Sequence, residues 1–331
     1  MHLVIALLVS SIVAATLSVL LPIAAAAQPA ERVRHIAVLI HGGGVPSGAV
    51  VNASLEVGLR ERGWVRGRNV ALEYRSGRPE RLSALASELV QLRPDVIVAH
   101  TNQAIEAAKS ASSTIPIVMV VAVDPVGAGL ITSLARPGGN VTGLTFDVDD
   151  AIWGKRLELL REAAPGIARV AVLWNPAYAP NRTRWLALEK AARSLGIALI
   201  SVEAEVGGNV ETRFALMVRE GVRGLFVLGD PMLFAIRAQI AELALRHRLP
   251  SVSPYREAAD AGGLMAYGLS LSGTFRHAAH YVDKILRGAK PGELPVEQPN
   301  VFELVINLKT ARALGLSIPT SLQGRAQELL E

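Results

Sequence analysis

Short apolar runs rich in Val and Ile alternate with segments of helical periodicity from His35 almost to the end of the chain. Runs that are apolar throughout are typical of strands in a parallel sheet that is covered on both faces. The helical segments between them supply the crossovers that parallel strands require. This alternation predicts an α/β fold built on doubly wound parallel sheets.

The alternation occurs twice and restarts near Pro165-Gly166. Predicted strands of the first series are 36–40, 70–74, 96–99, 117–123 and 141–146, with helices at 50–62, 81–92, 103–111 and 127–134. Predicted strands of the second series are 169–174, 198–202, 224–228, 251–253 and 264–267, with helices at 151–163, 182–195, 210–219 and 234–247. A helix at 273–287, a strand at 301–306 and a short C-terminal helix follow. Since a domain usually takes ~100 to 200 residues, we expect two Rossmann-like lobes.

The N-terminal segment is typical of a secretory signal peptide. An apolar run from Leu3 to Leu21 is followed by Ala25-Ala26-Ala27, a small-residue cleavage site, so residues 1–27 are the predicted leader. An uncleaved membrane anchor is the alternative, because the run is nearly long enough to span a bilayer. The leader predicts a secreted, periplasmic protein. Because the chain contains no cysteine, we expect neither a lipoprotein nor a disulfide.

The charge pattern argues against a nucleic-acid partner. The 34 basic and 29 acidic residues give a formal net charge of +5, and the basic residues alternate with Glu along the predicted helices instead of forming blocks. Few aromatic residues interleave with them, and no DNA-binding motif is present. We therefore expect no nucleic acid.

Candidate ligand-binding residues follow the predicted strands. In open α/β sheets, ligands bind beyond the carboxyl ends of the strands, where helix N-termini present free N–H groups. The candidates in the first series are Gly43, Ser47, Thr101, Asn102 and Asp124. Those in the second series are Asn175, Asn181, Asp230 and Tyr255.

Asp124 and Asp230 each precede a proline, which leaves two interpretations open. Asp is a good helix N-cap and Pro fits the first helical position, so both dipeptides would begin a helix in a protein that binds nothing. Alternatively, the two carboxylates face one another across a cleft and at least one of them pairs with a cationic group of a solute. The two roles are compatible.

Motifs for catalysis and metal binding are incomplete. His41-Gly42-Gly43-Gly44 resembles the oxyanion-hole turn of some lipases, but no serine has the G-x-S-x-G setting that such an enzyme needs. His277 and His280 lie three residues apart on a predicted helix without the carboxylates that would complete a zinc site. We expect no enzyme activity, no cofactor and no metal.

Six motifs, which occur together along most of the chain, resemble the ABC transporter substrate-binding protein family. They are Gly67-Arg68-Asn69-Val70, 124–130, 135–143, 171–176, 261–265 and 303–309. The resemblance implies the type I periplasmic binding protein architecture, with three crossovers that form a hinge. It assigns residues 33–147 and 272–297 to lobe 1, and residues 148–271 and 298–331 to lobe 2.

The family resemblance also implies a function and partners. A monomer of this kind captures a small solute between its lobes and delivers it to a membrane permease powered by a cytoplasmic ATPase. Some members bind aromatic amino acids, so an amino acid or a related compound is the suggested class. A secreted ligand-sensing subunit of a signalling system is an alternative with the same fold, whereas a sugar-responsive repressor would need a DNA-binding headpiece in place of a leader.

Overall fold

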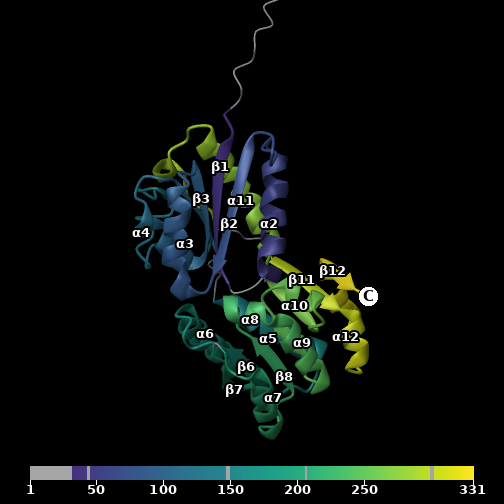
Figure 1. The fold of residues 1–331 in the computed structure, drawn as a ribbon. Coiled ribbons are helices and arrows are strands. Elements are labelled where there is room, and N and C mark those ends of the chain that lie inside the picture. Colours follow the sequence, from purple (N-terminus) through teal and green to yellow (C-terminus); the bar gives the residue numbers. More distant parts are fainter. Residues whose placement is uncertain (1–31, 43–44, 147–149, 206, 299–301) are drawn as a thin grey trace, which may run out of the picture. The chain divides into compact units, whose positions relative to one another are not determined.

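The computed structural model describes residues 32–331 except 43–44, 147–149, 206 and 299–301. The predicted leader and the candidate Gly43 lie outside the described residues. Residues Arg34–Glu331 form one compact unit that contains two β-sheets, each with helices on both faces (Figure 1). No helix within the described ranges is both long and apolar enough to cross a membrane.

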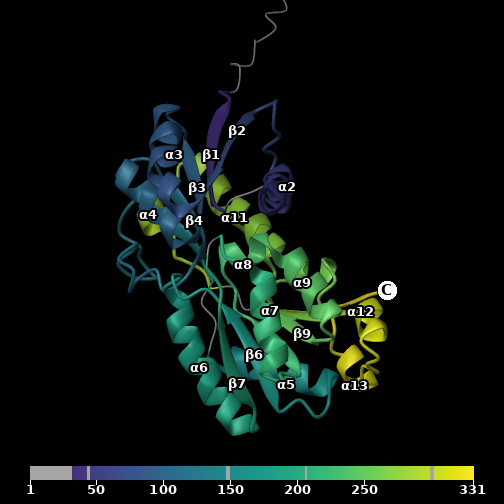
Figure 2. The ribbon, with the colours of Figure 1, turned by 60° about the horizontal axis from the view of Figure 1, so that its bottom comes forward.

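The first sheet has five parallel strands in the order β2-β1-β3-β4-β5. The strands are β1 (Arg34–His41), β2 (Val70–Gly77), β3 (Val96–His100), β4 (Ile117–Ala122) and β5 (Val141–Thr145). Alternate residues of β1 enter different cores: Ile36, Val38 and Ile40 pack with α2 (Val45–Arg60) and α11 (Leu271–Leu286). Ala37 and Leu39 pack with α3 (Pro79–Gln91) and α4 (Thr101–Ala111) on the opposite face (Figure 2). Burial on both faces explains why β1, β3 and β4 are apolar almost throughout, whereas the edge strand β2 is mixed in polarity and partly exposed.

The second sheet has seven strands in the order β12-β11-β10-β9-β8-β6-β7. They are β6 (Arg169–Trp174), β7 (Ala198–Glu203), β8 (Gly224–Val227), β9 (Ser251–Ser253), β10 (Met265–Leu269), β11 (Phe302–Asn307) and β12 (Glu328–Leu330). One core lies under α5 (Ala151–Ala163), α6 (Pro180–Leu195), α12 (Leu308–Ala313) and α13 (Thr320–Gln323). The other lies under α7 (Val210–Arg219), α8 (Pro231–Ala235) and α9 (Arg237–Arg246). The short α10 (Arg256–Asp260) packs on β10 and β11, and a single 3-10 turn, η1, spans Pro291–Glu293.

Helix α11 lies beside α2 although more than 200 residues separate them in sequence. The two helices approach closely at Gly58, where an added Cβ would lie 2.3 Å from the carbonyl oxygen of Arg276. Beyond the end of α2, Trp64 Nε1 donates a hydrogen bond of 2.8 Å to Asp283 Oδ1. Helix α11 therefore completes the layer over the first sheet.

The chain passes between the sheets after β5, after β10 and after η1. The third passage runs beside the end of β5, because Glu297 N donates to Gly143 O at 3.1 Å and Thr145 N donates to Glu297 O at 3.0 Å. The assignment of each element to one of the two sheets therefore supports three crossovers between the lobes. The residue boundaries of the lobes given above remain a prediction.

Several elements differ from the sequence prediction. The helix expected at 127–134 is wrong: Asp124 O accepts from Ala128 N, and Pro125 O accepts from Leu130 N, but these turns do not continue as a helix. The helix expected at 234–247 is divided at Ile236 into α8 and α9. The pair β10–β11 is antiparallel, while the other pairs of the second sheet are parallel.

Candidate functional site

Both sheets have a point where the strand order reverses, between β1 and β3 in the first and between β6 and β8 in the second. Such switch points are where doubly wound sheets bind ligands, beyond the carboxyl ends of the strands. His41 and Thr101 lie at the first switch point, and Asn175 and Asp230 follow the strands at the second. The carboxyl ends of the strands at both switch points therefore face one region between the lobes, where His41, Thr101 and Asp230 line the same pocket.

A pocket between the lobes joins the two edges, and we call it the deep pocket. The space not filled by atoms here is about 530 Å³, a figure that includes space open to solvent. Its lining is Ile40, His41, His100, Thr101, Val121, Leu271, Tyr178, Arg184, Asp230, Pro231, Phe234 and Tyr255.

A wider space of about 1350 Å³, the outer cleft, adjoins the deep pocket. Tyr178 and Arg184 line both spaces, so they are continuous at these two residues. The outer cleft is also lined by Asn102, Gln103, Glu106, Val123, Asp124, Gly127, Ala128, Phe146, Asp150, Trp153, Ala179, Pro180 and Thr183. A solute could therefore enter through the outer cleft.

Asp230 is a buried carboxyl at the start of α8, and its side chain is 2% exposed. Its Oδ1 accepts from Met232 N at 2.8 Å and Leu233 N at 3.0 Å, so it is the predicted N-cap of this helix. Asn181 Nδ2 donates to Oδ2 at 3.4 Å. Burial raises the pKa of Asp230 to about 6, although these three donors and the charge of Arg184 oppose the increase. The carboxyl can therefore change its charge when a cation arrives.

Arg184 places a cation beside Asp230 at the junction of the two spaces. Its Nη1 donates to Gly229 O at 2.6 Å and to Asn181 Oδ1 at 3.2 Å. Its guanidinium lies 5.7 Å from the ring centre of Tyr178 and 5.8 Å from that of Trp153. These contacts hold the side chain in place, and the remaining nitrogens give it the geometry to bind a carboxylate.

Aromatic side chains form much of the apolar wall. Tyr255 lies edge-on to Phe234 with ring centres 5.2 Å apart. The ring centre of Phe146, from the first lobe, lies 6.4 Å from that of Tyr255. Burial raises the pKa values of Tyr178 and Tyr255, so both phenols are neutral at physiological pH. Such a wall suits a flat apolar group.

The first lobe contributes a neutral polar wall. His41 Nδ1 and Thr101 Oγ1 are 3.1 Å apart, and the buried Nδ1 of His100 has no hydrogen-bond partner within the described part of the chain. Burial lowers the pKa of His41 and lowers that of His100 to about 3, so both rings are uncharged at neutral pH. The ionisable side chains that face the deep pocket with a charge at neutral pH, Arg184 and Asp230, belong to the second lobe.

Two β-branched residues of this wall have left-handed backbone conformations: φ is +72° at Thr101 and +60° at Val121. Each such residue costs about 1 to 3 kcal/mol, so the surrounding fold must hold it there. Both line the deep pocket. Two of the strained backbone positions thus lie at the ends of β3 and β4 that face the site.

The structure brings some sequence candidates into the cleft and not others. Thr101, Asp230 and Tyr255 line the deep pocket, and Asn102 and Asp124 line the outer cleft. Asn175 and Asn181 line neither space; the carbonyl of Asn175 accepts from Asn181 Nδ2 at 3.2 Å, and Asn181 also contacts Asp230 and Arg184. Ser47 lies in α2, and its side chain is outside the described part, as is Gly43.

Asp124 differs from Asp230 in setting. It is exposed, and its Oδ1 caps a turn by accepting from Gly127 N at 2.9 Å, so the expected helix cap is wrong here. A Cβ at Gly127 would lie 2.0 Å from Asp124 Oδ2, so any other residue here would displace this carboxylate. The two carboxylates line different spaces, so direct opposition across the cleft stays a prediction. Asn102 supports this turn, since its side chain donates to Val123 O at 2.7 Å and accepts from Val123 N at 2.9 Å.

Sequence reasoning missed Trp153, Tyr178, Arg184, Phe234 and His100 as cleft residues. Arg184 could have been found, because it lies one helical turn after the candidate Asn181 and so shares its face of α6. Within the described residues, no group of three or more His, Asp and Glu side chains could hold a metal ion.

Known proteins resemble this chain over nearly all of its described length. A family model described as "ABC transporter substrate binding protein" matches residues 36–330. A "Tyrosine-binding protein" of Clostridioides difficile is 24% identical over 260 residues, which cover 78% of this chain and 74% of that protein.

Solved structures share the fold. A conserved domain protein from Vibrio cholerae aligns with a TM-score of 0.81 and 28% identity, over 90% of this chain and all of that one. An ABC domain from Streptococcus pneumonia in complex with L-Trp aligns with a TM-score of 0.80 and 22% identity, over 90% of this chain and all of that one. More distant solved structures, among them a leucine-binding protein and a glucose-galactose binding protein at 15% identity, share the predicted fold.

Proposed function

The chain belongs to the ABC transporter substrate-binding protein family, and from this premise we propose that it binds an aromatic amino acid in its interlobe cleft. As a member of this family it is the solute-binding component of an ABC transporter, and it captures its ligand without a chemical reaction. The proposal concerns which solute it captures and which residues recognise it.

The combination of groups in the deep pocket carries this proposal. Arg184 and Asp230 offer opposite charges in the same pocket that Phe234 and Tyr255 line with aromatic rings. An α-amino acid presents an anionic carboxylate and a cationic ammonium on the same carbon, so it can satisfy both charges at once. An aromatic side chain then packs against the ring wall. The names of the tyrosine-binding relative and of the L-Trp complex support the same class.

Each recognising group has a defined role in this proposal. Arg184 binds the carboxylate of the solute, because a guanidinium matches a carboxylate with two parallel hydrogen bonds. Asp230 binds the ammonium, whose positive charge further favours the ionised form of the carboxyl. The neutral His41 and Thr101 complete the polar wall from the first lobe.

The two-lobed arrangement links binding to transport. Because each lobe supplies part of the lining, a solute makes all its contacts when the lobes are closed, and its binding favours closure. We propose that the closed monomer, exported to the periplasm after removal of residues 1–27, is the form that delivers the solute to a membrane permease with its cytoplasmic ATPase.

Isothermal titration calorimetry of the purified protein with the standard amino acids and with glucose tests the proposal. We expect the tightest binding with one of the aromatic amino acids and none with glucose. Arg184→Met should weaken binding at least about tenfold, which corresponds to about 1.4 kcal/mol. Arg182→Met, an exposed change on the same helix, is the matched control and should bind like the parent. Binding of glucose, or no binding of any aromatic amino acid, would contradict this assignment.

A further inference from the structure

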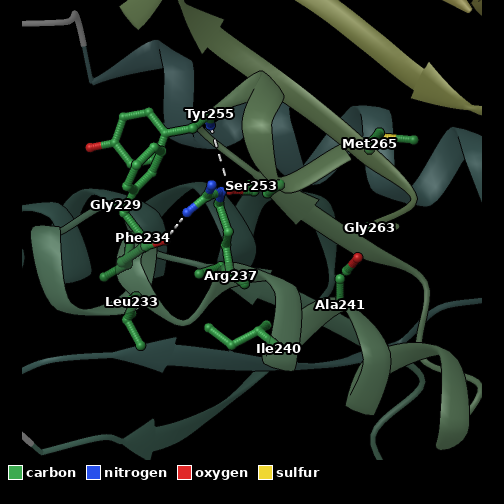
Figure 3. A pocket seen from close by; sticks show the side chains of 14 residues that line it. Gly229, Leu233, Phe234, Arg237, Ile240, Ala241, Ser253, Tyr255, Gly263 and Met265 are labelled. Carbon is green, nitrogen blue, oxygen red and sulfur yellow. Dashed lines mark hydrogen bonds between the residues drawn. The ribbon is translucent and has the colours of Figure 1, made fainter. Parts of the chain in front are cut away.

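A third space lies inside the second lobe, behind the deep pocket, and we call it the inner pocket (Figure 3). The space not filled by atoms here is about 440 Å³, a figure that includes space open to solvent. Leu233, Ile240 and Met265 give it apolar walls, while Ser253 and Arg237 supply polar atoms. It lies between α8 and α9 on one side and the ends of β8 and β9 on the other.

Two aromatic rings separate the inner pocket from the deep pocket. Phe234 and Tyr255 line both spaces, and their ring centres are 5.2 Å apart. The ring of Tyr255 lies close over Gly229, where an added Cβ would be 2.8 Å from the phenol oxygen. Because these two rings fill the boundary, one of them must move aside before a solute can pass from the deep pocket into the inner pocket.

Arg237 gives the inner pocket an unsatisfied donor. Its Nη1 donates to Phe234 O at 3.0 Å, and its guanidinium lies 4.6 Å from the ring centre of Phe234, as Figure 3 shows. Its Nε is buried and has no hydrogen-bond partner among the described residues. A buried donor without an acceptor is unfavourable, so an acceptor that enters the pocket would be bound here.

The charge of Arg237 is not neutralised by a close carboxylate in the described part of the chain. Glu257 of the adjacent α10 is 6% exposed, and neither of its carboxylate oxygens has a hydrogen-bond partner there. Burial raises the pKa of Glu257, which favours its neutral form, although the charge of Arg237 opposes this. The inner pocket therefore combines apolar walls with a donor that carries positive charge.

We propose that the inner pocket is the distal part of the ligand site and receives the far end of an aromatic side chain that carries a hydrogen-bond acceptor, such as a phenol. The ring of the solute enters past Phe234 and Tyr255, whose side chains move apart to admit it, and Arg237 Nε donates to the acceptor. This inference rests on the proposed function. It makes Arg237 and the walls of the inner pocket the residues that distinguish phenolic from plain phenyl solutes.

A blocked pocket tests the inference. Ala241 lines the inner pocket, while Ala244 is equally buried three residues later on α9 but does not line it. We expect Ala241→Val to weaken L-tyrosine binding at least about tenfold in calorimetry, and Ala244→Val, whose added methyl groups enter a packed core, to leave affinity within about twofold. Thermal melts of both variants establish that they fold. If Ala241→Val folds and binds L-tyrosine like the parent, the inner pocket takes no part.

Arg237→Met tests recognition of the acceptor separately from packing. The parent should bind L-tyrosine at least about tenfold more tightly than L-phenylalanine, and in Arg237→Met this ratio should fall to within about twofold of unity. A purely structural role would weaken both ligands equally. An unchanged ratio would overturn the role given to Arg237.

A fragment separates failure of this inference from failure of the proposed function. p-Cresol carries the phenol end without the amino-acid end, so it probes the inner pocket alone. With methyl-labelled methionine, p-cresol should shift the Met265 resonance in the parent and not in Ala241→Val, while the buried Met119 stays unchanged. If L-tyrosine binds and p-cresol leaves Met265 unaffected, the inference is overturned and the proposed function stands. If no aromatic amino acid binds, the Met265 shift alone decides for or against the inner pocket.

Discussion

Replacing Asp230 by Asn separates its structural role from its electrostatic role. Asn and Asp cap helices about equally well, so the bonds to Met232 N and Leu233 N can persist. Burial raises the pKa of Asp230 from 3.8 to about 6. Because one pH decade corresponds to about 1.36 kcal/mol, ionisation of this carboxyl costs the ligand-free protein about 3 kcal/mol at pH 7.5. Losing the hydrogen bond from Asn181 destabilises the variant by about 1 kcal/mol, which offsets part of this gain.

The net expectation is that Asp230→Asn is about 1 to 2 kcal/mol more stable than the parent at pH 7.5. The sign depends on pH. A raised pKa means that the folded state holds the proton more tightly than the unfolded chain, so this group lowers stability as pH rises from 3.8 to about 6. At pH 4 the advantage of the variant should vanish. Urea unfolding followed by tryptophan fluorescence at pH 4, 6 and 7.5 measures the difference.

The same variant should bind its solute less well. We expect at least about a tenfold loss of affinity for an aromatic amino acid at pH 7.5, because the ammonium loses its charged partner. Calorimetry of the parent at pH 6 in two buffers of different ionisation enthalpy should also show proton release on binding. A variant that is less stable than the parent at pH 7.5 would refute the electrostatic argument. A more stable variant that binds as tightly as the parent would show that Asp230 does not contact the ammonium.

Three further predictions concern the leader, the hinge and the helix packing. Mass spectrometry of exported protein should show an N-terminus at or near Gln28, and an intact Met1 in the membrane fraction would contradict cleavage. Small-angle scattering should give a smaller radius of gyration at saturating ligand, and an unchanged radius would contradict closure. Gly58→Ala should lower the free energy of unfolding by about 1 to 3 kcal/mol, since its Cβ meets backbone of α11. The control, Val57→Ala at a partly exposed position of α2, should stay close to the parent in urea unfolding.

The strands were predictable because their cause is local in sequence. A strand buried on both faces needs apolar residues at every position, and that pattern is visible without any knowledge of partners. The Asp-Pro dipeptides were harder to interpret. Asp230-Pro231 begins a helix, whereas Asp124-Pro125 begins a series of turns in which Gly129 has φ +68°. Capping chemistry is the same in both, so the dipeptide alone does not determine the outcome.

The site was only partly predictable, for a similar reason. Strand-end reasoning reaches Thr101 and Asp230, since the topology fixes where strands end. Helical spacing from Asn181 points to Arg184, but strand ends alone do not, and the orientation of its side chain also depends on a hydrogen bond to Gly229 O, 45 residues away in sequence. Phe146 and Tyr255 meet only because the lobes lie side by side. Contacts of this kind depend on tertiary structure and leave no periodic signal in the sequence.

The interleaved connectivity also governs when the molecule can fold. Helix α11 covers the first sheet, and β11 and β12 extend the second, so neither lobe is complete until residues far along the chain have been synthesised. Contacts between segments this distant form slowly, because a long loop must close before they contribute. For a chain that we propose to be exported, late completion of both cores would keep the nascent polypeptide unfolded long enough to be translocated.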